Sequence, residues 1–260
     1  MAAARPATMV RVGEALYTTE DAGASWHKSA ALHGKRGQVA LSADGRILLH
    51  SPEGQMGSYR SLDLGASWTP VRGLNHADMR AVADPLDPAV FYAYDDGYGD
   101  GDGNRNGNLL ASVDGGASFV RRSRLPAGAS TLIRLAPCRA GELWVALKDG
   151  GLARSQDGGL HFRRLANVGY CAALGFGKPA SSGHYPALYI WGTVGGVRGV
   201  HRSNDAGASW LRVNDDAHQY GGPGDDQFVV GDMNTYGVVY MSTAGRGIVY
   251  GKPAAPLGSE

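Results

Sequence analysis

The chain has 260 residues and nearly balanced charge, with 25 basic and 24 acidic side chains, which excludes a protein that coats nucleic acid or an anionic membrane through a basic excess. Hydrophobic residues make up 43%, so the 40 glycines do not mark a disordered linker. No apolar run approaches the ~18–20 residues that span a bilayer, and residues 1–6 hold no apolar core of a secretory signal.

Short strands bounded by Gly, Asp and Pro clusters are predicted along the whole chain. The segments with β-branched, aromatic or alternating residues are 39–42, 47–50, 79–83, 90–94, 109–112, 131–135, 143–147, 187–191, 238–242 and 248–250. We expect no amphipathic helix of 10 or more residues. The fold class is therefore all-β.

One octapeptide, [ST]-x-D-x-G-x-x-[WF], recurs five times, at 19–26, 61–68, 112–119, 155–162 and 203–210. Its aspartate can accept hydrogen bonds from backbone N–H groups a few residues on, and its glycine permits a positive φ. Five copies at a regular period indicate turn architecture rather than an active site. We therefore assign a structural role to the five aspartates of these Asp boxes: Asp21, Asp63, Asp114, Asp157 and Asp205.

The spacing between successive boxes is 42 to 51 residues, which is typical of a β-propeller with four-stranded blades. About six blades are recognisable. The first lacks its opening strands, and the last, near 228–252, has no box. We therefore predict an incomplete seven-bladed propeller, with one domain at 1–252 and a tail at 253–260.

A metal site is suggested weakly by one loop. Asp100, Asp102, Asn104 and Asn106 match the first half of a calcium loop, but the twelfth position from Asp102 is valine rather than glutamate. A long solvated loop is the alternative. No glycine-rich stretch opens a helix, and the histidines lack metal spacing, so no cofactor is expected. The two cysteines, Cys138 and Cys171, could pair or remain thiols.

The C-terminal third carries a more specific resemblance. Residues 184–203, 210–221, 231–232, 236–240 and 245–251 resemble the closing portion of glycoside hydrolase family 74, and residues 6–13 resemble a strand of its second propeller. That family comprises xyloglucanases and related β-1,4-glucanases. The resemblance implies polysaccharide degradation by two seven-bladed propellers that face each other across a cleft. It also implies inverting hydrolysis with one catalytic Asp from each propeller, in secreted enzymes.

The chain has room for one propeller, and the catalytic Asp of the family's second propeller would fall just before Met1. We therefore expect a truncated piece that lacks both catalytic aspartates, that is inactive or nearly so alone, and that associates with itself. A missing N-terminal propeller is a possible partner of this piece. The alternative is a stand-alone propeller that binds a carbohydrate or a protein without catalysis.

Few residues remain as functional candidates. An inverting pair needs two carboxyl groups about 6.5–9.5 Å apart. Asp216 and Asp232 lie in the family-like motifs, with loop hydrogen bonding as their alternative role. For contact with a β-glucan or xyloglucan we select Trp191, Tyr220, His218 and Tyr98, with core packing as the alternative for the aromatic rings. The scattered arginines argue against sialidase chemistry.

Overall fold

The structure is a computed structural model that describes residues 1–30, 33–77, 79–95, 107–126, 129, 132–224 and 228–253. These residues form 22 strands and contain no helix, and hence none that could cross a membrane. The prediction of an all-β fold is confirmed.

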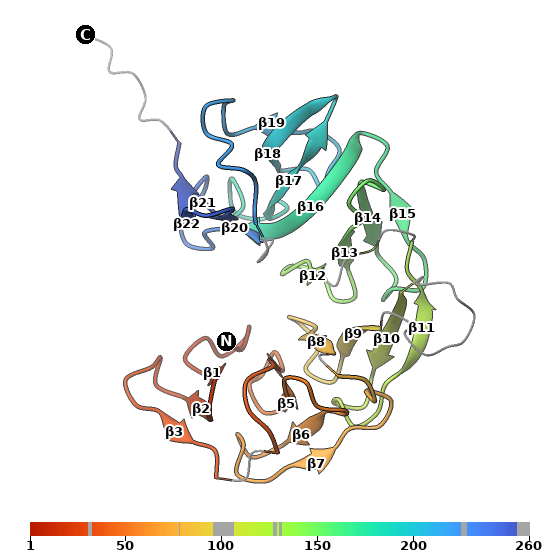
Figure 1. Cartoon of the computed structure of the whole chain (residues 1–260), viewed down its shortest axis with the longest axis vertical. Helices are drawn as coiled ribbons and strands as arrows, with labels where there is room; N and C mark the ends of the chain where they lie inside the picture. Colours follow the sequence, from red (N-terminus) through yellow and green to blue (C-terminus); the bar gives the residue numbers. More distant parts are fainter. Residues whose placement is uncertain are drawn as a thin grey trace. The chain divides into compact units, whose positions relative to one another are not determined.

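The strands form six sheets, four of four strands and two of three, numbered here in chain order (Figure 1). Sheet 1 contains β1 (Met9–Val12), β2 (Leu16–Thr19) and β3 (His27–Lys28). Sheet 2 contains β4 (Gln38–Leu41), β5 (Leu48–Ser51), β6 (Tyr59–Ser61) and β7 (Thr69–Pro70). Sheet 3 contains β8 (Arg80–Ala83), β9 (Phe91–Asp95), β10 (Asn108–Ser112) and β11 (Val120–Arg124).

Sheet 4 contains β12 (Ile133–Leu135), β13 (Leu143–Ala146), β14 (Leu152–Ser155) and β15 (Arg163–Arg164). Sheet 5 contains β16 (Val168–Gly177), β17 (Ala187–Val194), β18 (Val197–Ser203) and β19 (Leu211–Arg212). Sheet 6 contains β20 (Val229–Gly231), β21 (Val239–Thr243) and β22 (Gly247–Gly251).

In every sheet the strands that follow one another along the chain are also neighbours in space. Antiparallel meanders of four strands are the blades of a β-propeller, so the predicted architecture is confirmed. The ten predicted strands are all present with shifts at their ends, as for 187–191, which extends to the whole of β17. Two long strands, β16 and β18, were not predicted because their Gly, Ala and Arg residues lack a strand-like pattern.

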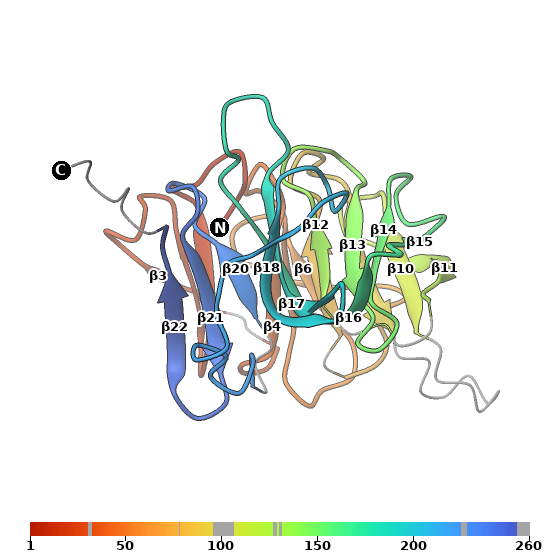
Figure 2. The same ribbon diagram turned by 90° about the horizontal axis from the view of Figure 1, so that it is seen from above.

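Sheets 1 and 6 are each one strand short. In sheet 1 the outer strand β3 follows a box, as β7 does in sheet 2, so the missing strand is the one that corresponds to β4. In the described residues neither a box nor an outer strand follows β22 in sheet 6. Figure 2 shows the three strands of sheet 6 side by side, with β22 at their edge. Both shortfalls agree with the expectation from the boxes.

The contacts divide the chain into two compact units. Unit 1 contains Met1–Pro126, Arg139–Leu143 and Ser155–His161, and unit 2 contains Ala127–Cys138, Trp144–Arg154 and Phe162–Glu260. A buried cluster around Leu49, Leu74 and Phe91 stabilises unit 1. Another around Trp144 and Ile190 stabilises unit 2. One domain over 1–252 stays a prediction.

Candidate functional site

The five octapeptides form turns with one hydrogen-bond pattern. In the second, the Ser67 N–H and Oγ donate to the Asp63 carboxylate at 2.8 and 2.6 Å, and Ser61 Oγ donates to it at 2.7 Å. The Gly65 N–H donates to Ser61 Oγ at 2.8 Å, and Gly65 has a φ of +92°. The contacts to the aspartate and to the first hydroxyl recur around Asp21, Asp114, Asp157 and Asp205.

These turns keep their carboxylates ionised. The Ser67 side chain, then its N–H, and then Ser61 lower the pKa of Asp63 to about 2 through hydrogen bonds to the charged form. A general acid needs a pKa close to the working pH. The geometry therefore favours a structural role for Asp63 and its four counterparts.

The residues that follow β19 form a second kind of acidic loop, at 214–224. Asn214 holds its beginning: Oδ1 accepts the Val200 N–H at 2.8 Å, and Nδ2 donates to the carbonyls of Asp215 and His218. The His218 N–H donates to Asp215 Oδ1 at 2.9 Å, and the His218 Nδ1 lies 2.6 Å from the same oxygen. The hydrogen bond from the His218 ring lowers the pKa of Asp215.

The middle of this loop is turned to solvent. The Asp216 side chain is 90% exposed and pairs with the Arg212 guanidinium at 2.5 Å, which lowers the pKa of Asp216. Tyr220 has a φ of +49°, which is rare outside glycine. Its ring lies at 62° to the His218 ring with centroids 5.8 Å apart, and the Arg246 guanidinium lies 5.6 Å from its centroid.

One flank of the loop borders a hollow of about 540 Å³, here called the Tyr170 hollow. Its walls are Tyr170, Trp191, Arg198, Gln219 and the backbone of 221–224. The Arg198 guanidinium lies 4.8 Å from the centroid of the Tyr170 ring, and Gln219 Nε2 donates to the Arg198 carbonyl at 3.1 Å. Trp191 is only 5% exposed, and a Cβ at Gly222 would lie 3.1 Å from its indole ring. Gly222 therefore lets the loop pack directly on Trp191.

The other flank borders a hollow of about 510 Å³ between sheets 5 and 6, here called the β22 hollow. On the side of sheet 5 its apolar lining comes from Val200 on β18 and from Val213 directly after β19. On the side of sheet 6 it comes from Val239, Met241 and Val249. The polar residues Asp215, His218 and Tyr220 of the loop also line it.

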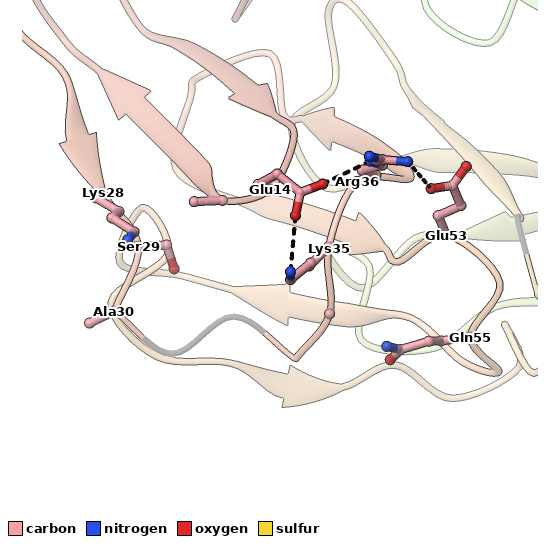
Figure 3. Close-up of a pocket in the computed structure, with 10 residues that line it drawn as sticks. Glu14, Lys28, Ser29, Ala30, Lys35, Arg36, Glu53 and Gln55 are labelled. Carbon is pink, nitrogen blue, oxygen red and sulfur yellow. Dashed lines mark hydrogen bonds and ion pairs between the residues drawn. The ribbon is translucent and has the colours of Figure 1, made fainter.

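Unit 1 has a larger pocket, of about 770 Å³, near Lys28. Figure 3 shows Glu14 between Lys35 and Arg36, to which it is joined at 2.9 and 3.0 Å, and Arg36 reaches Glu53 at 3.7 Å. No aromatic ring is among the ten described residues that line this pocket, and the charges of Glu14, Lys35, Arg36 and Glu53 compensate one another. It is a poorer candidate for a sugar than the Tyr170 hollow.

The structure separates the residues chosen from the sequence. Trp191 lines the Tyr170 hollow, whereas His218 and Tyr220 line the β22 hollow. Asp216 lies at the exposed tip of the loop, and Asp232 accepts the N–H groups of Asn234 and Thr235 at 2.6 and 2.8 Å in the turn after β20.

The remaining predictions from the sequence concern a sugar contact, a calcium site and the two cysteines. The contact residue Tyr98 and the calcium candidates Asp100, Asp102, Asn104 and Asn106 lie outside the described residues. Within the described part of the chain, no group of three or more His, Cys, Asp or Glu side chains could hold a metal. Cys138 is exposed and Cys171 is buried, and no disulfide joins them.

Known proteins match almost the whole chain. It is 37% identical over 268 residues to a xyloglucanase of Paenibacillus sp, which covers 95% of this chain and 25% of the relative. A xyloglucanase of Acetivibrio thermocellus is 37% identical over 84% of the chain and 24% of its own length. The crystal structure of a GH74 enzyme of Niastella koreensis has a TM-score of 0.88 at 43% identity, covering 99% of this chain and 36% of that one. No family model matches.

This chain belongs to glycoside hydrolase family 74. A GH74 xyloglucanase structure from Xanthomonas campestris agrees, with a TM-score of 0.80 at 34% identity over 97% of this chain and 36% of that one. The chain spans about a quarter of the length of the two curated relatives named above. Activity, substrate and partners of a whole family 74 enzyme therefore do not transfer to it directly.

Two residues that line the Tyr170 hollow of this family 74 chain were not predicted from the sequence. Arg198 stands in the family-like segment 184–203 but carried no signal of its own. Tyr170 lies on β16, a strand that was not predicted. Only the pairing of β16, β17 and β18 brings Tyr170, Trp191 and Arg198 together.

Proposed function

We propose that the chain binds a xyloglucan-type β-glucan in the Tyr170 hollow and does not hydrolyse it alone. The observation that carries this proposal is an aromatic hollow with adjacent donors, in a family 74 chain whose relatives are named xyloglucanases. Its volume of about 540 Å³ lies within the ~300–1,000 Å³ range of small-molecule sites.

The chemistry of the walls suits a sugar. Arg198 is exposed and keeps its guanidinium over the Tyr170 ring, so N–H donors for sugar hydroxyl groups lie beside an apolar face. The glycines at 221, 222 and 224 all have positive φ and leave the backbone uncovered by side chains. Trp191 is buried, so it contributes a rigid wall rather than a free stacking face.

Hydrolysis requires a general acid and a general base, and neither Asp216 nor Asp232 has the surroundings that a general acid needs. Asp216 is exposed, and the Arg212 hydrogen bond lowers its pKa, whereas a general acid needs a raised one. Asp232 is engaged in a turn with two backbone N–H groups. We therefore propose that catalysis needs a second propeller, as the resemblance implies, and that the full enzyme is secreted. A propeller that only binds carbohydrate remains the alternative.

Calorimetric titration with a xyloglucan oligosaccharide, followed by product analysis, tests this proposal. Saturable binding without new reducing ends is expected. Tyr170→Ala and Arg198→Ala should each weaken binding at least tenfold. Tyr17→Ala is the matched control, because Arg11 lies 4.8 Å from the Tyr17 ring centroid on sheet 1, the same distance as in the Arg198–Tyr170 pair.

Two results would contradict the proposal. Binding that survives both substitutions, or no binding at all, would remove the Tyr170 hollow as the sugar site. Turnover that disappears in Asp216→Asn or Asp232→Asn would show a complete acid/base pair in this chain.

A further inference from the structure

The outer edge of a complete sheet is built in one way throughout the chain. A box turn follows the third strand and leads into an outer strand: β7, β11, β15 or β19. Sheet 6 ends at β22, which pairs with β21 alone in the described part of the chain. Among the described residues, the second edge of β22 therefore has no counterpart of β7, β11, β15 or β19.

The box aromatic residue also fills the space between its sheet and the preceding one. Trp210, from the box of sheet 5, packs on a cluster that contains Trp144 and Leu165. Trp68, from the box of sheet 2, packs in the same way on a cluster that contains Leu16. Sheet 6 has no box in the described residues, and the β22 hollow of about 510 Å³ lies against sheet 5 at the corresponding place.

At the same place, a side chain that follows the outer strand of the preceding sheet donates a hydrogen bond to the glycine carbonyl of the box. Ser29 Oγ donates to the Gly65 carbonyl at 2.5 Å, and Asn167 Nδ2 donates to the Gly207 carbonyl at 3.0 Å. In sheet 5, Asn214 follows β19, and its Nδ2 donates to carbonyls of its own loop. The 214–224 loop thus makes hydrogen bonds of its own and leaves the β22 hollow open.

The edge of β22 is chemically suited to a strand. Natural edge strands are protected by charges, prolines or bulges. β22 has none of these between Gly247 and Gly251, and Ile248 and Tyr250 are 66% and 65% exposed. Arg246 and Lys252 flank the strand at either end, and Arg212 and Asp215 line the hollow beside it.

We propose that β22 and the β22 hollow receive a polypeptide segment from outside these 260 residues that carries the octapeptide [ST]-x-D-x-G-x-x-[WF] and its following strand. The strand pairs with β22, and the aromatic side chain enters the hollow. The boxes of sheets 2 and 5 show what occupies the equivalent place. A folded second copy cannot supply the segment, because its own boxes are held in its own sheets.

A synthetic peptide with the sequence of residues 203–213 of this chain is the probe. It should bind the full chain saturably and slow amide hydrogen exchange at Ile248, Val249 and Tyr250. The peptide with Trp210→Ala should bind at least tenfold more weakly, because it has nothing to place in the hollow. This comparison uses the unaltered chain, so it does not depend on the folding of a variant.

Two substitutions on the same strand give a matched pair. Val249 lines the hollow, and Ile248 points to the opposite face of the sheet because side chains alternate along a strand. Val249→Lys should weaken peptide binding at least tenfold, whereas Ile248→Lys should change it less than twofold. Thermal melts verify that both variants are folded.

Three outcomes would overturn the proposal. The first is an absence of peptide binding at millimolar concentration. The second is equal binding of the Trp210→Ala peptide, which would indicate non-specific pairing along the edge. The third is a homodimer that Val249→Lys dissociates while the peptide fails to bind, which would assign this surface to a second copy of the chain.

Discussion

The box turn at 203–210 and the loop at 214–224 lie on either side of β19, and both contain ionised aspartates. In the turn, the Ser209 N–H and Oγ and the Ser203 Oγ donate to Asp205, so the partners belong to the turn itself. In the loop, Asp215 and Asp216 are paired with the side chains of His218 and Arg212.

The difference lies in what surrounds each aspartate. The turn is fixed against a neighbouring sheet, because Gly207 packs beneath Leu165 and its carbonyl accepts the Asn167 amide. The loop is held at Asn214, Gln219 and Gly222 but is exposed at its middle. An aspartate-rich sequence therefore marks scaffold in one place and an adaptable surface in the other. Only the contacts distinguish the two.

Replacing one glycine by alanine in each region should give the largest difference between the turn and the loop, measured as the loss in free energy of unfolding. Gly207 has a φ of +84°, and a Cβ there would lie 2.3 Å from Leu165 Cδ2, so Gly207→Ala should destabilise the fold by about 3 kcal/mol or more through backbone strain and overpacking. Gly221 has a φ of +72°, but a Cβ there would lie near the Ala244 Cβ alone, at 3.2 Å. Gly221→Ala should therefore destabilise the fold by about 1 kcal/mol, close to the cost of the positive φ by itself.

Urea denaturation measures both free energies. Equal losses, or a larger loss in the Gly221→Ala variant, would mean that the loop is as firmly packed as the turn.

Acid should weaken the turns next. The pKa of Asp63 is about 2 in the folded state against 3.8 ordinarily, so its contribution to stability is complete above pH 3.8 and is lost as pH falls toward 2. The melting temperature should therefore fall between about pH 4 and pH 2. Asp63→Asn should lower it at pH 7 and reduce this acid-dependent fall.

Ser67→Ala is the control for this prediction. It keeps the Asp63 carboxyl but removes the side-chain hydrogen bond that lowers the pKa most, so it should show part of the same effect. If the melting temperature of both variants fell with acid as in the unaltered chain, the Asp63 turn would not be a cause of the acid sensitivity of the fold.

The local features were predictable from the sequence because each is encoded within a few residues. The octapeptide contains both partners of its hydrogen bonds, such as Ser61 and Ser67 around Asp63. The alternating strands could be read in the same way. β16 was missed because Gly169, Gly175 and the alanines between them resemble a loop when their burial in a sheet is not known.

The Tyr170 hollow could not be predicted, since it depends on register between distant strands. Val168 pairs with Val194 and Gly192 with Gly199, which sets Tyr170 beside Arg198. The sequence did indicate Trp191, but not that its ring is buried under Gly222. His218 and Tyr220 were chosen for the same site, yet they line the β22 hollow on the other flank of the loop. Their role in sugar binding stays a prediction.

The smallest effect should come from the charge at the tip of the loop. Asp216 is exposed and pairs with Arg212, and it does not line the Tyr170 hollow, so Asp216→Asn should leave both the melting temperature and the affinity for a xyloglucan oligosaccharide unchanged. Thermal melts and calorimetry of this variant beside Tyr170→Ala make the comparison. A lower affinity in Asp216→Asn would place the glucan over the middle of the loop, and the boundary of the binding surface would then shift from the Tyr170 hollow toward Tyr220 and Arg246.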